Sequence, residues 1–337
     1  MTTDVIDKFK RPLKDLRVSV TDRCNFRCPY CMPAEIYGER YSFLPKKELL
    51  SFEEISRVAQ IAVDMGVNKL RLTGGEPLVR EGIEELVAML ARIDGVEDLA
   101  MTTNAYLLKA KADILKNAGL KRITVSLDSL DEEVFQRMNG RGFGPAKVLD
   151  GISAAKEVGL LPIKVNTVVK KGVNEHTLVA LADYCRTNQY IPRFIEYMDV
   201  GTLNGWRKDD VVSANEIVEM IDAVFPLQPI EPSYKGEVAT RYKYVDGGGE
   251  IGVISSVSQP FCGDCTRLRL SPEGQLVTCL FAEKGTDLRS PMREGASDNE
   301  MRRIIEKTWK LRDDRYSEER AQSTKARTKV EMYHIGG

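Results

Sequence analysis

Residues 15–31 read Asp-Leu-Arg-Val-Ser-Val-Thr-Asp-Arg-Cys-Asn-Phe-Arg-Cys-Pro-Tyr-Cys, a strand pattern that runs directly into three cysteines. Apolar and polar residues alternate over 16–20, which predicts a strand with one buried face. Three thiolates this close together suit iron–sulfur ligation, but a four-iron cluster ordinarily takes four cysteines. Cys24, Cys28 and Cys31 therefore predict an iron with an open coordination position, and an open metal position is where a ligand can bind.

The composition excludes several classes of function. A chain of 337 residues allows one or two domains, and 42% of the residues are hydrophobic. The formal net charge of −1 argues against a general nucleic-acid or membrane-surface binder. No apolar run approaches the roughly 18 residues of a membrane span, and residues 1–8 contain no apolar signal core. We therefore expect a cytoplasmic protein that binds neither nucleic acid nor membrane.

Strand and helix patterns alternate over the first two-thirds of the chain. Strands are expected at 16–20, 69–73, 99–103, 122–127, 162–169 and 193–198. Helices are expected at 51–66, 83–90, 107–118, 145–158 and 175–188. Six strand–helix units predict an α/β fold with a parallel sheet and helices outside it.

One polar face recurs on these strands, whereas a sheet covered on both faces reads as continuous apolar runs. Arg17, Arg71 and Lys164, for example, alternate with apolar neighbours. A closed barrel of eight units has a filled apolar interior. We therefore expect a partial (βα)6 TIM-like barrel with a wet interior, formed by residues 8–225.

Residues 226–337 are expected to form a small C-terminal α+β domain. Its pattern predicts a hairpin from 242–245 and 250–254, a second hairpin that turns at 271–274, and a helix near 299–311. The second hairpin brings together another triad, Cys262, Cys265 and Cys279. The turn predicts that Leu270 pairs with Gln275, which places Cys265 within one residue of Cys279.

Arg267 and Arg269 share the strand parity of Cys265, so all three side chains are expected on one side. Guanidinium groups fixed beside an open iron would bind oxyanions.

A zinc site is the alternative for each triad. Zinc prefers four protein ligands, and His176 and His334 are far from the first triad in sequence. For the second triad, Asp264 or a remote histidine could supply the fourth ligand. An odd number of clustered cysteines without an export signal favours metal ligation in a reducing compartment. Cys185 stands alone in an expected helix, where we expect a buried structural thiol.

The Cys-x3-Cys-x2-Cys spacing, with an aromatic residue before the last cysteine, resembles that of the radical S-adenosylmethionine enzymes. Gly74-Gly75-Glu76-Pro77, at the end of the second expected strand, strengthens this resemblance. The second triad, the segment 265–269 and the final Gly336-Gly337 resemble the GTP 3′,8-cyclase family of molybdenum cofactor biosynthesis. This narrower resemblance extends from Asp15 to the end of the sequence.

The resemblance implies two [4Fe–4S] clusters, one on each triad, together with S-adenosylmethionine. It implies contacts to S-adenosylmethionine from Tyr30, Gly74, Gly75, Ser126 and Met198. It implies contacts to GTP from Arg17, Lys69, Arg71, Thr102, Lys164, Arg193, Arg267, Leu268 and Arg269. Residues implied to act at the reaction centre are Arg17, Arg267, Arg269, Gly336 and Gly337.

The implied reaction begins with reductive cleavage of S-adenosylmethionine to a 5′-deoxyadenosyl radical. The radical abstracts hydrogen from C3′ of GTP, and C3′–C8 cyclisation gives (8S)-3′,8-cyclo-7,8-dihydro-GTP, a lyase-type first step of molybdenum cofactor biosynthesis. The resemblance also implies an electron donor and a downstream cyclic pyranopterin monophosphate synthase, and a homodimer is a further expectation.

Two alternatives stay open. One is a peptide-modifying radical S-adenosylmethionine enzyme with an auxiliary cluster, and the other is a non-enzymatic iron–sulfur or zinc protein. The inward-facing cations favour the cyclase, because a peptide substrate needs no cage for a triphosphate.

Overall fold

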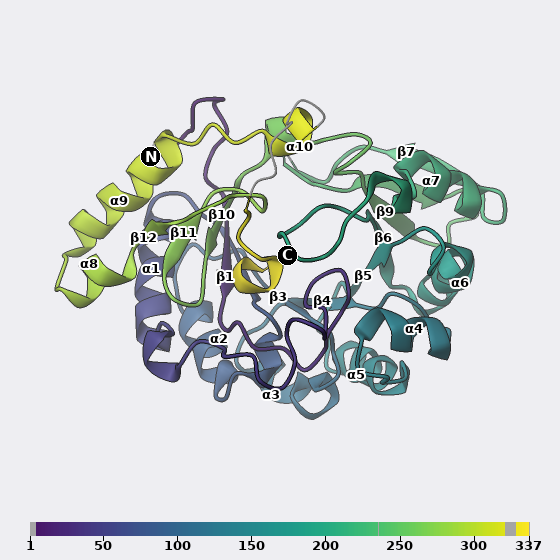
Figure 1. The fold of residues 1–337 in the computed structure, drawn as a ribbon, viewed down its shortest axis with the longest axis horizontal. Coiled ribbons are helices and arrows are strands. Elements are labelled where there is room, and N and C mark those ends of the chain that lie inside the picture. The colour runs from purple at the N-terminus through teal and green to yellow at the C-terminus, as the bar shows by residue number, and fades with distance from the viewer. Residues whose placement is uncertain (1–4, 235, 321–327, 337) are drawn as a thin grey trace.

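A curved sheet of twelve strands organises the part of the chain that the computed structural model describes, residues 5–234, 236–320 and 328–336. Its centre consists of six consecutive parallel strands: β1 (Asp15–Ser19), β2 (Lys69–Thr73), β3 (Asp98–Thr103), β4 (Arg122–Ser126), β5 (Lys164–Val169) and β6 (Ile191–Glu196). Figure 1 shows the helices along the outside of an arc, with the C-terminal end near its centre. The expected partial barrel is confirmed.

Helices cover the outer face of this sheet. They are α1 (Phe52–Asp64), α2 (Ile83–Ala91), α3 (Ala112–Asn117), α4 (Glu132–Asn139), α5 (Ala146–Glu157), α6 (Leu178–Asn188) and α7 (Ala214–Asp222). The first begins where a capping box predicts it, because Ser51 Oγ accepts a hydrogen bond from the Glu54 amide. The expected helix 107–118 is divided into a 3₁₀ turn, Leu108–Ala110, and α3. Sequence analysis missed α4, a short helix in which Asp131 is the N-cap.

One hydrophobic core lies between the sheet and these helices. Leu16, Val18, Leu70 and Leu72 are fully buried in it, as the strand alternation predicts. The same core includes Trp309, from the C-terminal part of the chain. The polar residues between these apolar positions are left on the inner face of the sheet.

The residues after 225 extend the sheet at both edges. At one edge, β9 (Glu250–Ile254) pairs parallel with β6 and is followed outward by β8 (Thr240–Tyr244) and β7 (Leu227–Ile230). At the other edge, β10 (Arg267–Leu270) pairs parallel with β1 and is followed by β11 (Gln275–Val277) and β12 (Thr286–Asp287). The connection 255–266, which carries Cys262 and Cys265, therefore joins the two sides of the partial barrel.

In the described part of the chain after 288, the helices are α8 (Arg289–Arg293), α9 (Asp298–Lys310), α10 (Tyr316–Glu319) and α11 (Met332–Ile335). Figure 1 shows α8 and α9 beside the β10–β12 edge, and α11 in the middle of the arc. The last described helix thus lies over the inner face of the sheet.

The register of the second hairpin corrects the expected one by a single residue. Leu270 pairs with Leu276, and not with Gln275. The Gly274 backbone has a φ of +88°, a left-handed conformation that follows a turn through Pro272. Ser271 is hydrogen-bonded to Gln275 through the backbone, so the loop consists of the three residues 272–274. The expected pairing of Leu270 with Gln275 would have left a loop of two residues.

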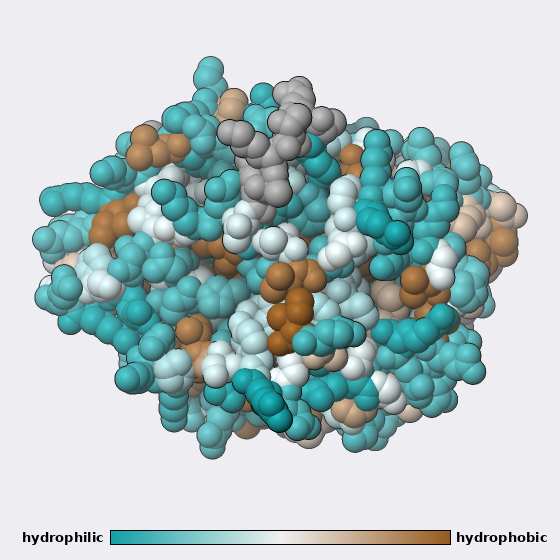
Figure 2. Space-filling model, viewed as in Figure 1, coloured by the Kyte–Doolittle hydropathy of each residue, from teal (hydrophilic) through white to brown (hydrophobic). Residues whose placement is uncertain are grey.

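The outer surface is mostly polar on the side shown in Figure 2, where hydrophobic residues are exposed in small separate groups. Among the helices of the described residues, none is long and apolar enough to span a bilayer.

Candidate active site

Two adjoining cavities lie on the inner face of the sheet, and one cysteine triad lines each. Cys24, Cys28 and Cys31 line the first cavity. Cys262, Cys265 and Cys279 line the second. The residues that line both are Thr102, Asn166, Ile195, Met198 and Leu280. The two triads therefore face one connected space.

The first cavity brings together every residue expected to contact S-adenosylmethionine. Tyr30, Gly74, Gly75, Ser126 and Met198 all line it. The Tyr30 hydroxyl donates a hydrogen bond to Asp128 Oδ2 at 2.8 Å, and the Val168 amide donates one to the other carboxylate oxygen at 2.9 Å. Burial raises the pKa of Asp128 to about 6.

The glycine pair positions the cysteine loop. A Cβ atom added to Gly75 would lie 2.4 Å from the Arg23 carbonyl oxygen, and one added to Gly74 would lie 2.6 Å from the Thr21 carbonyl oxygen. The Gly75 amide donates to Thr21 O at 2.8 Å, and the Glu76 amide donates to Arg23 O at 2.8 Å. The glycines thus allow the end of β2 to pack on the backbone that leads to Cys24. The resemblance implies that both glycines contact S-adenosylmethionine. The structure shows, in addition, that their backbone packs closely on the loop that carries the first triad.

Buried groups around the first triad favour protonated thiols in the protein without metal. Burial, reinforced by the nearby Glu76 carboxylate, raises the pKa of Cys24 to about 12. Burial also raises the pKa of Cys28 and of Cys31 well above the usual range of a thiol. Metal binding at this triad would therefore release protons.

The second cavity contains an unusual number of buried cations. Its lining includes Arg11, Arg17, Arg71, Arg193, Arg267, Arg269 and Arg312, with Asp314 as the carboxylate among the lining residues. Within the described chain, five of these arginines have a buried Nε atom without a hydrogen-bond partner: Arg17, Arg71, Arg193, Arg269 and Arg312. Arg17, Arg71 and Arg269 form no ion pair with a carboxylate in the described chain, so burial of their charges costs several kcal/mol, a penalty that a bound anion would offset.

Strand register concentrates this charge. Arg17 on β1 pairs with Arg269 on β10 and with Arg71 on β2, so three arginines lie side by side. Like charges placed opposite each other destabilise a sheet. Burial and the neighbouring arginines lower the pKa of Arg17 to about 10 and that of Arg269 to about 9. This row of three arginines is therefore suited to bind a multiply charged anion.

Three residues expected at GTP lie elsewhere on the barrel. Lys69 and Lys164 begin β2 and β5, outside the lining of either cavity, and Lys69 Nζ lies 3.1 Å from the centroid of the Tyr234 ring. Burial and the adjacent Arg193 lower the pKa of Lys164 to about 7. The Leu268 side chain is buried in the hydrophobic core, on the opposite face of β10 from Arg267 and Arg269.

Arg193, which the resemblance implies as a GTP contact, points into the second cavity. It forms an ion pair with Glu237, with a distance of 3.3 Å between Arg193 Nη2 and Glu237 Oε1. Thr102 accepts a hydrogen bond from Arg71 Nη1 at 3.1 Å. Both residues expected from the resemblance therefore lie in the cavity.

The last described residues lie against the first cavity. Met332 and Tyr333 line it. Gly336 has a φ of +71°, and a Cβ atom added there would lie 2.0 Å from Thr73 Cγ2. Only glycine fits this contact. Gly337 lies outside the described residues.

Sequence analysis missed Arg11 and Arg312 in the second cavity. Both lie outside the barrel strands, where no alternation signals an inward direction. Their positions depend on contacts between distant segments, which a local pattern does not reveal.

The thiols fit iron–sulfur clusters better than single metal ions. In the described part of the chain, no group of three His, Cys, Asp or Glu side chains is arranged around one ion. Neither His176 nor His334 lines a cavity, and His334 lies 2.7 Å from Glu273. Neither histidine is therefore in place to complete a zinc site at a triad.

Sequence comparison identifies the family. Residues 18–185 match the radical S-adenosylmethionine superfamily model, and residues 191–318 match the model for molybdenum cofactor synthesis C. A GTP 3′,8-cyclase from Staphylococcus haemolyticus is 48% identical over 100% of both chains. A GTP 3′,8-cyclase from Acidothermus cellulolyticus is 53% identical over 95% of this chain and 90% of its own. The chain belongs to the GTP 3′,8-cyclase family.

Solved structures support the fold of this family member. The crystal structure of Streptococcus suis SuiB bound to precursor peptide SuiA matches with a TM-score of 0.62 at 16% identity, over 92% of this chain and 67% of that one. Another SuiB structure matches with a TM-score of 0.60 at 17% identity, over 94% and 70% of the two chains. At this identity the likeness concerns the fold alone.

Substitution of Gly75 tests the loop packing. We expect Gly75→Ala to displace the backbone before Cys24, because the new Cβ meets backbone atoms that cannot move independently. A displacement of this kind should lower reductive cleavage of S-adenosylmethionine by about 100-fold. Iron analysis after anaerobic reconstitution should show loss at the first triad only.

Gly38→Ala is the matched control, since its nearest contact would be an ordinary 3.4 Å to Ala34 O. Unchanged cleavage and iron content in Gly75→Ala would contradict this role of the glycine pair.

Proposed function

We propose that this chain is a GTP 3′,8-cyclase that catalyses the first step of molybdenum cofactor biosynthesis. The observation that carries the proposal is the row of buried, unpaired arginines between two cysteine triads. Cys24, Cys28 and Cys31 would hold the [4Fe–4S] cluster that, with one electron from an external donor, would supply a 5′-deoxyadenosyl radical from S-adenosylmethionine, and Cys262, Cys265 and Cys279 would hold the second cluster. Removal of the C3′ hydrogen of GTP, C3′–C8 bond formation and uptake of a second electron and a proton would give (8S)-3′,8-cyclo-7,8-dihydro-GTP.

The two cavities divide the binding of the two small molecules. Tyr30, Gly74, Gly75, Ser126 and Met198 would hold S-adenosylmethionine at the first triad. The second triad would receive the guanine end of GTP. Five guanidinium groups would surround its phosphates, because one guanidinium can donate two parallel hydrogen bonds to a phosphate. They belong to Arg17, Arg71, Arg193, Arg267 and Arg269.

Lys69 and Lys164 fit this arrangement as more distant charges. They lie at the starts of their strands, outside the lining of the second cavity. The low pKa of Lys164, about 7, reflects burial and the neighbouring guanidinium groups. A bound triphosphate would raise it again by supplying negative charge.

The junction of the cavities is where the reacting atoms would meet. Thr102, Asn166 and Met198 line both cavities, so a ribose placed there faces the first cavity. Correct placement contributes much of the rate of such a reaction. Met332, Tyr333 and Gly336 lie over the first cavity and would limit the entry of water.

Several parts of the function follow from the family resemblance. They are the lyase class, an external electron donor and a downstream cyclic pyranopterin monophosphate synthase. A homodimer is a separate proposal. A cytoplasmic location is consistent with cysteines that all remain free thiols among the described residues.

Only the likeness of fold supports the alternative of a peptide-modifying enzyme. SuiB shares that fold and binds a precursor peptide. The buried row of Arg17, Arg71 and Arg269, without carboxylate partners in the described chain, suits a polyanion better than a peptide backbone, which carries no net charge. The family relationship agrees with this preference.

The reaction can be tested with the anaerobically purified full chain. We expect about eight irons per chain if both triads hold four-iron clusters. Reductant, S-adenosylmethionine and GTP together should yield 5′-deoxyadenosine, and GTP deuterated at C3′ should pass its label to that product. Four irons plus zinc, no response to GTP, or retention of the label would overturn the proposal.

Substitution of Arg269 tests the arginine row. Arg269→Gln should weaken GTP binding about 30-fold, as expected for loss of one hydrogen bond between charged groups. Cleavage of S-adenosylmethionine without GTP turnover should persist, because Arg269 lines only the second cavity. Calorimetric titration with GTP and assay of 5′-deoxyadenosine measure the two effects.

The control is Arg137→Gln, an exposed arginine of α4. Equal loss of GTP binding and of S-adenosylmethionine cleavage in Arg269→Gln would contradict a specific role at the phosphates.

Substitution of Glu237 should act in the opposite direction. Its carboxylate pairs with Arg193 and would compete with the triphosphate for that guanidinium. Glu237→Gln should therefore tighten GTP binding by roughly fivefold, equivalent to about 1 kcal/mol. Glu231→Gln removes the same charge from an exposed position in the same segment and should leave the dissociation constant unchanged. The same dissociation constant for GTP in both variants would show that Glu237 does not compete with the triphosphate for Arg193.

A further inference from the structure

Arg312 makes a direct contact with a cysteine of the second triad. It lies two residues beyond the end of α9, and its Nη2 atom donates to Cys265 Sγ at 3.0 Å. Its Nη1 atom donates to the Cys265 carbonyl oxygen at 2.7 Å. One guanidinium therefore holds both the backbone and the sulfur of this residue.

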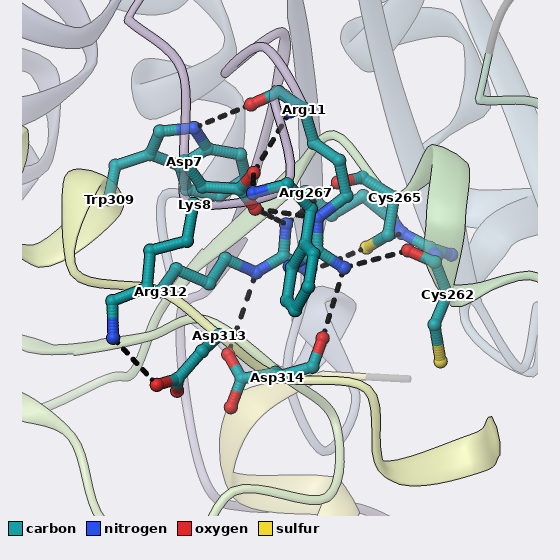
Figure 3. Close-up of polar contacts among 11 residues, drawn as sticks. Asp7, Lys8, Arg11, Cys262, Cys265, Arg267, Trp309, Arg312, Asp313 and Asp314 are labelled. Carbon is teal, nitrogen blue, oxygen red and sulfur yellow. Dashed lines mark hydrogen bonds and ion pairs between the residues drawn. The ribbon is translucent and has the colours of Figure 1, made fainter. Parts of the chain in front are cut away.

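A buried network fixes the Arg312 guanidinium (Figure 3). Asp7 Oδ2 lies 3.5 Å from Arg312 Nη1 and 2.6 Å from Arg11 Nε. The Trp309 ring lies 4.6 Å from the Arg312 guanidinium carbon and donates through Nε1 to the Arg11 carbonyl oxygen at 3.0 Å. Because Asp7, Arg11 and Arg312 are all buried, this arrangement costs free energy that burial of apolar side chains would not.

Comparison with Arg11 separates two roles. Arg11 Nη1 donates to the carbonyl oxygens of Cys262 and Asp314, at 2.7 and 3.0 Å, which holds the loop by its backbone. An anchor of this kind needs no contact with sulfur. Arg312 forms a similar backbone contact and, in addition, directs a charged N–H group at Cys265 Sγ.

At the first triad, Arg27 Nη1 donates to the Cys24 carbonyl oxygen at 2.7 Å, but among the described residues no guanidinium donates to a sulfur of that triad. Cys24 Sγ accepts hydrogen bonds from the Phe26 amide at 3.4 Å and from the Asn104 side-chain amide at 3.9 Å, and both donors are neutral. Hydrogen bonds to cluster sulfurs and the net charge around a cluster are among the factors that set its reduction potential. Addition of one electron makes a cluster more negative by one charge, and a nearby guanidinium stabilises that charge.

We propose that Arg312, held by Asp7 and Trp309, is a positioning residue that raises the reduction potential of the cluster bound at the second triad. This inference rests on the proposed function, which places a [4Fe–4S] cluster on Cys265. It assigns a role to the N-terminal segment and to the end of α9, neither of which belongs to the barrel.

The test is a potentiometric titration of the reconstituted full chain, followed by electron paramagnetic resonance. The signal that changes when GTP is added reports the second cluster, and the signal that changes with S-adenosylmethionine reports the first. Arg312→Gln should shift the reduction equilibrium of the second cluster about tenfold toward the oxidised form, about 59 mV lower for a one-electron couple. The first cluster should keep its potential.

Asp7→Asn supplies a change of opposite sign. It removes the negative charge beside Arg312 and Arg11, so the potential of the second cluster should rise. A purely structural network would loosen in both variants and move the potential in one direction. Arg303→Gln, at an exposed position of α9, should change neither cluster.

The outcomes distinguish this inference from the proposed function. Fewer than eight irons in the unsubstituted chain would count against the proposed function itself. With eight irons present, an unchanged potential in Arg312→Gln, or shifts of the same sign in Arg312→Gln and Asp7→Asn, would overturn the role of Arg312. If the Arg312→Gln variant loses iron from the second triad, the Asp7→Asn variant alone provides the test. A reduction potential of its second cluster that fails to rise would overturn the inference.

Discussion

Repulsion among buried arginines is the physical constraint on which the site depends. Parallel pairing places Arg269, Arg17 and Arg71 next to one another across three strands. The apolar residues between them lie in the core, so the strands cannot turn the arginines outward without exposing Leu16, Leu70 and Leu268. The packing of the core thereby holds like charges together, and a polyanion relieves the cost.

Alternation along the strands predicted this arrangement well. It gave the six barrel strands and the inward direction of Arg17 and Arg71, because side chains of a strand alternate strictly between two faces. Position along the strand was less predictable. Lys69 and Lys164 have the expected parity but begin their strands, so they lie outside the lining of both cavities.

The remaining differences arise from contacts that a local pattern does not contain. The register of the second hairpin depends on a left-handed Gly274, which moved the pairing of Leu270 by one residue. Arg11 and Arg312 enter the second cavity from segments about 300 residues apart in sequence, and the contact through Asp7 brings them together. The helix α4 has few apolar residues, which hid it from an analysis based on periodicity.

The two triads differ in their electrostatic surroundings as well as in their loops. At Cys24, burial and a carboxylate raise the pKa to about 12. At Cys265, burial opposes ionisation, but Arg267 and Arg312 outweigh it and lower the pKa to about 6. Because the connection 255–266 joins β9 to β10, the two strands that flank the six barrel strands, the same loop that carries Cys265 also brings Arg267 beside Arg17 and Arg269. Negative charge bound in the second cavity would therefore link the barrel strands to the C-terminal strands, and such binding would stabilise the folded chain as a whole.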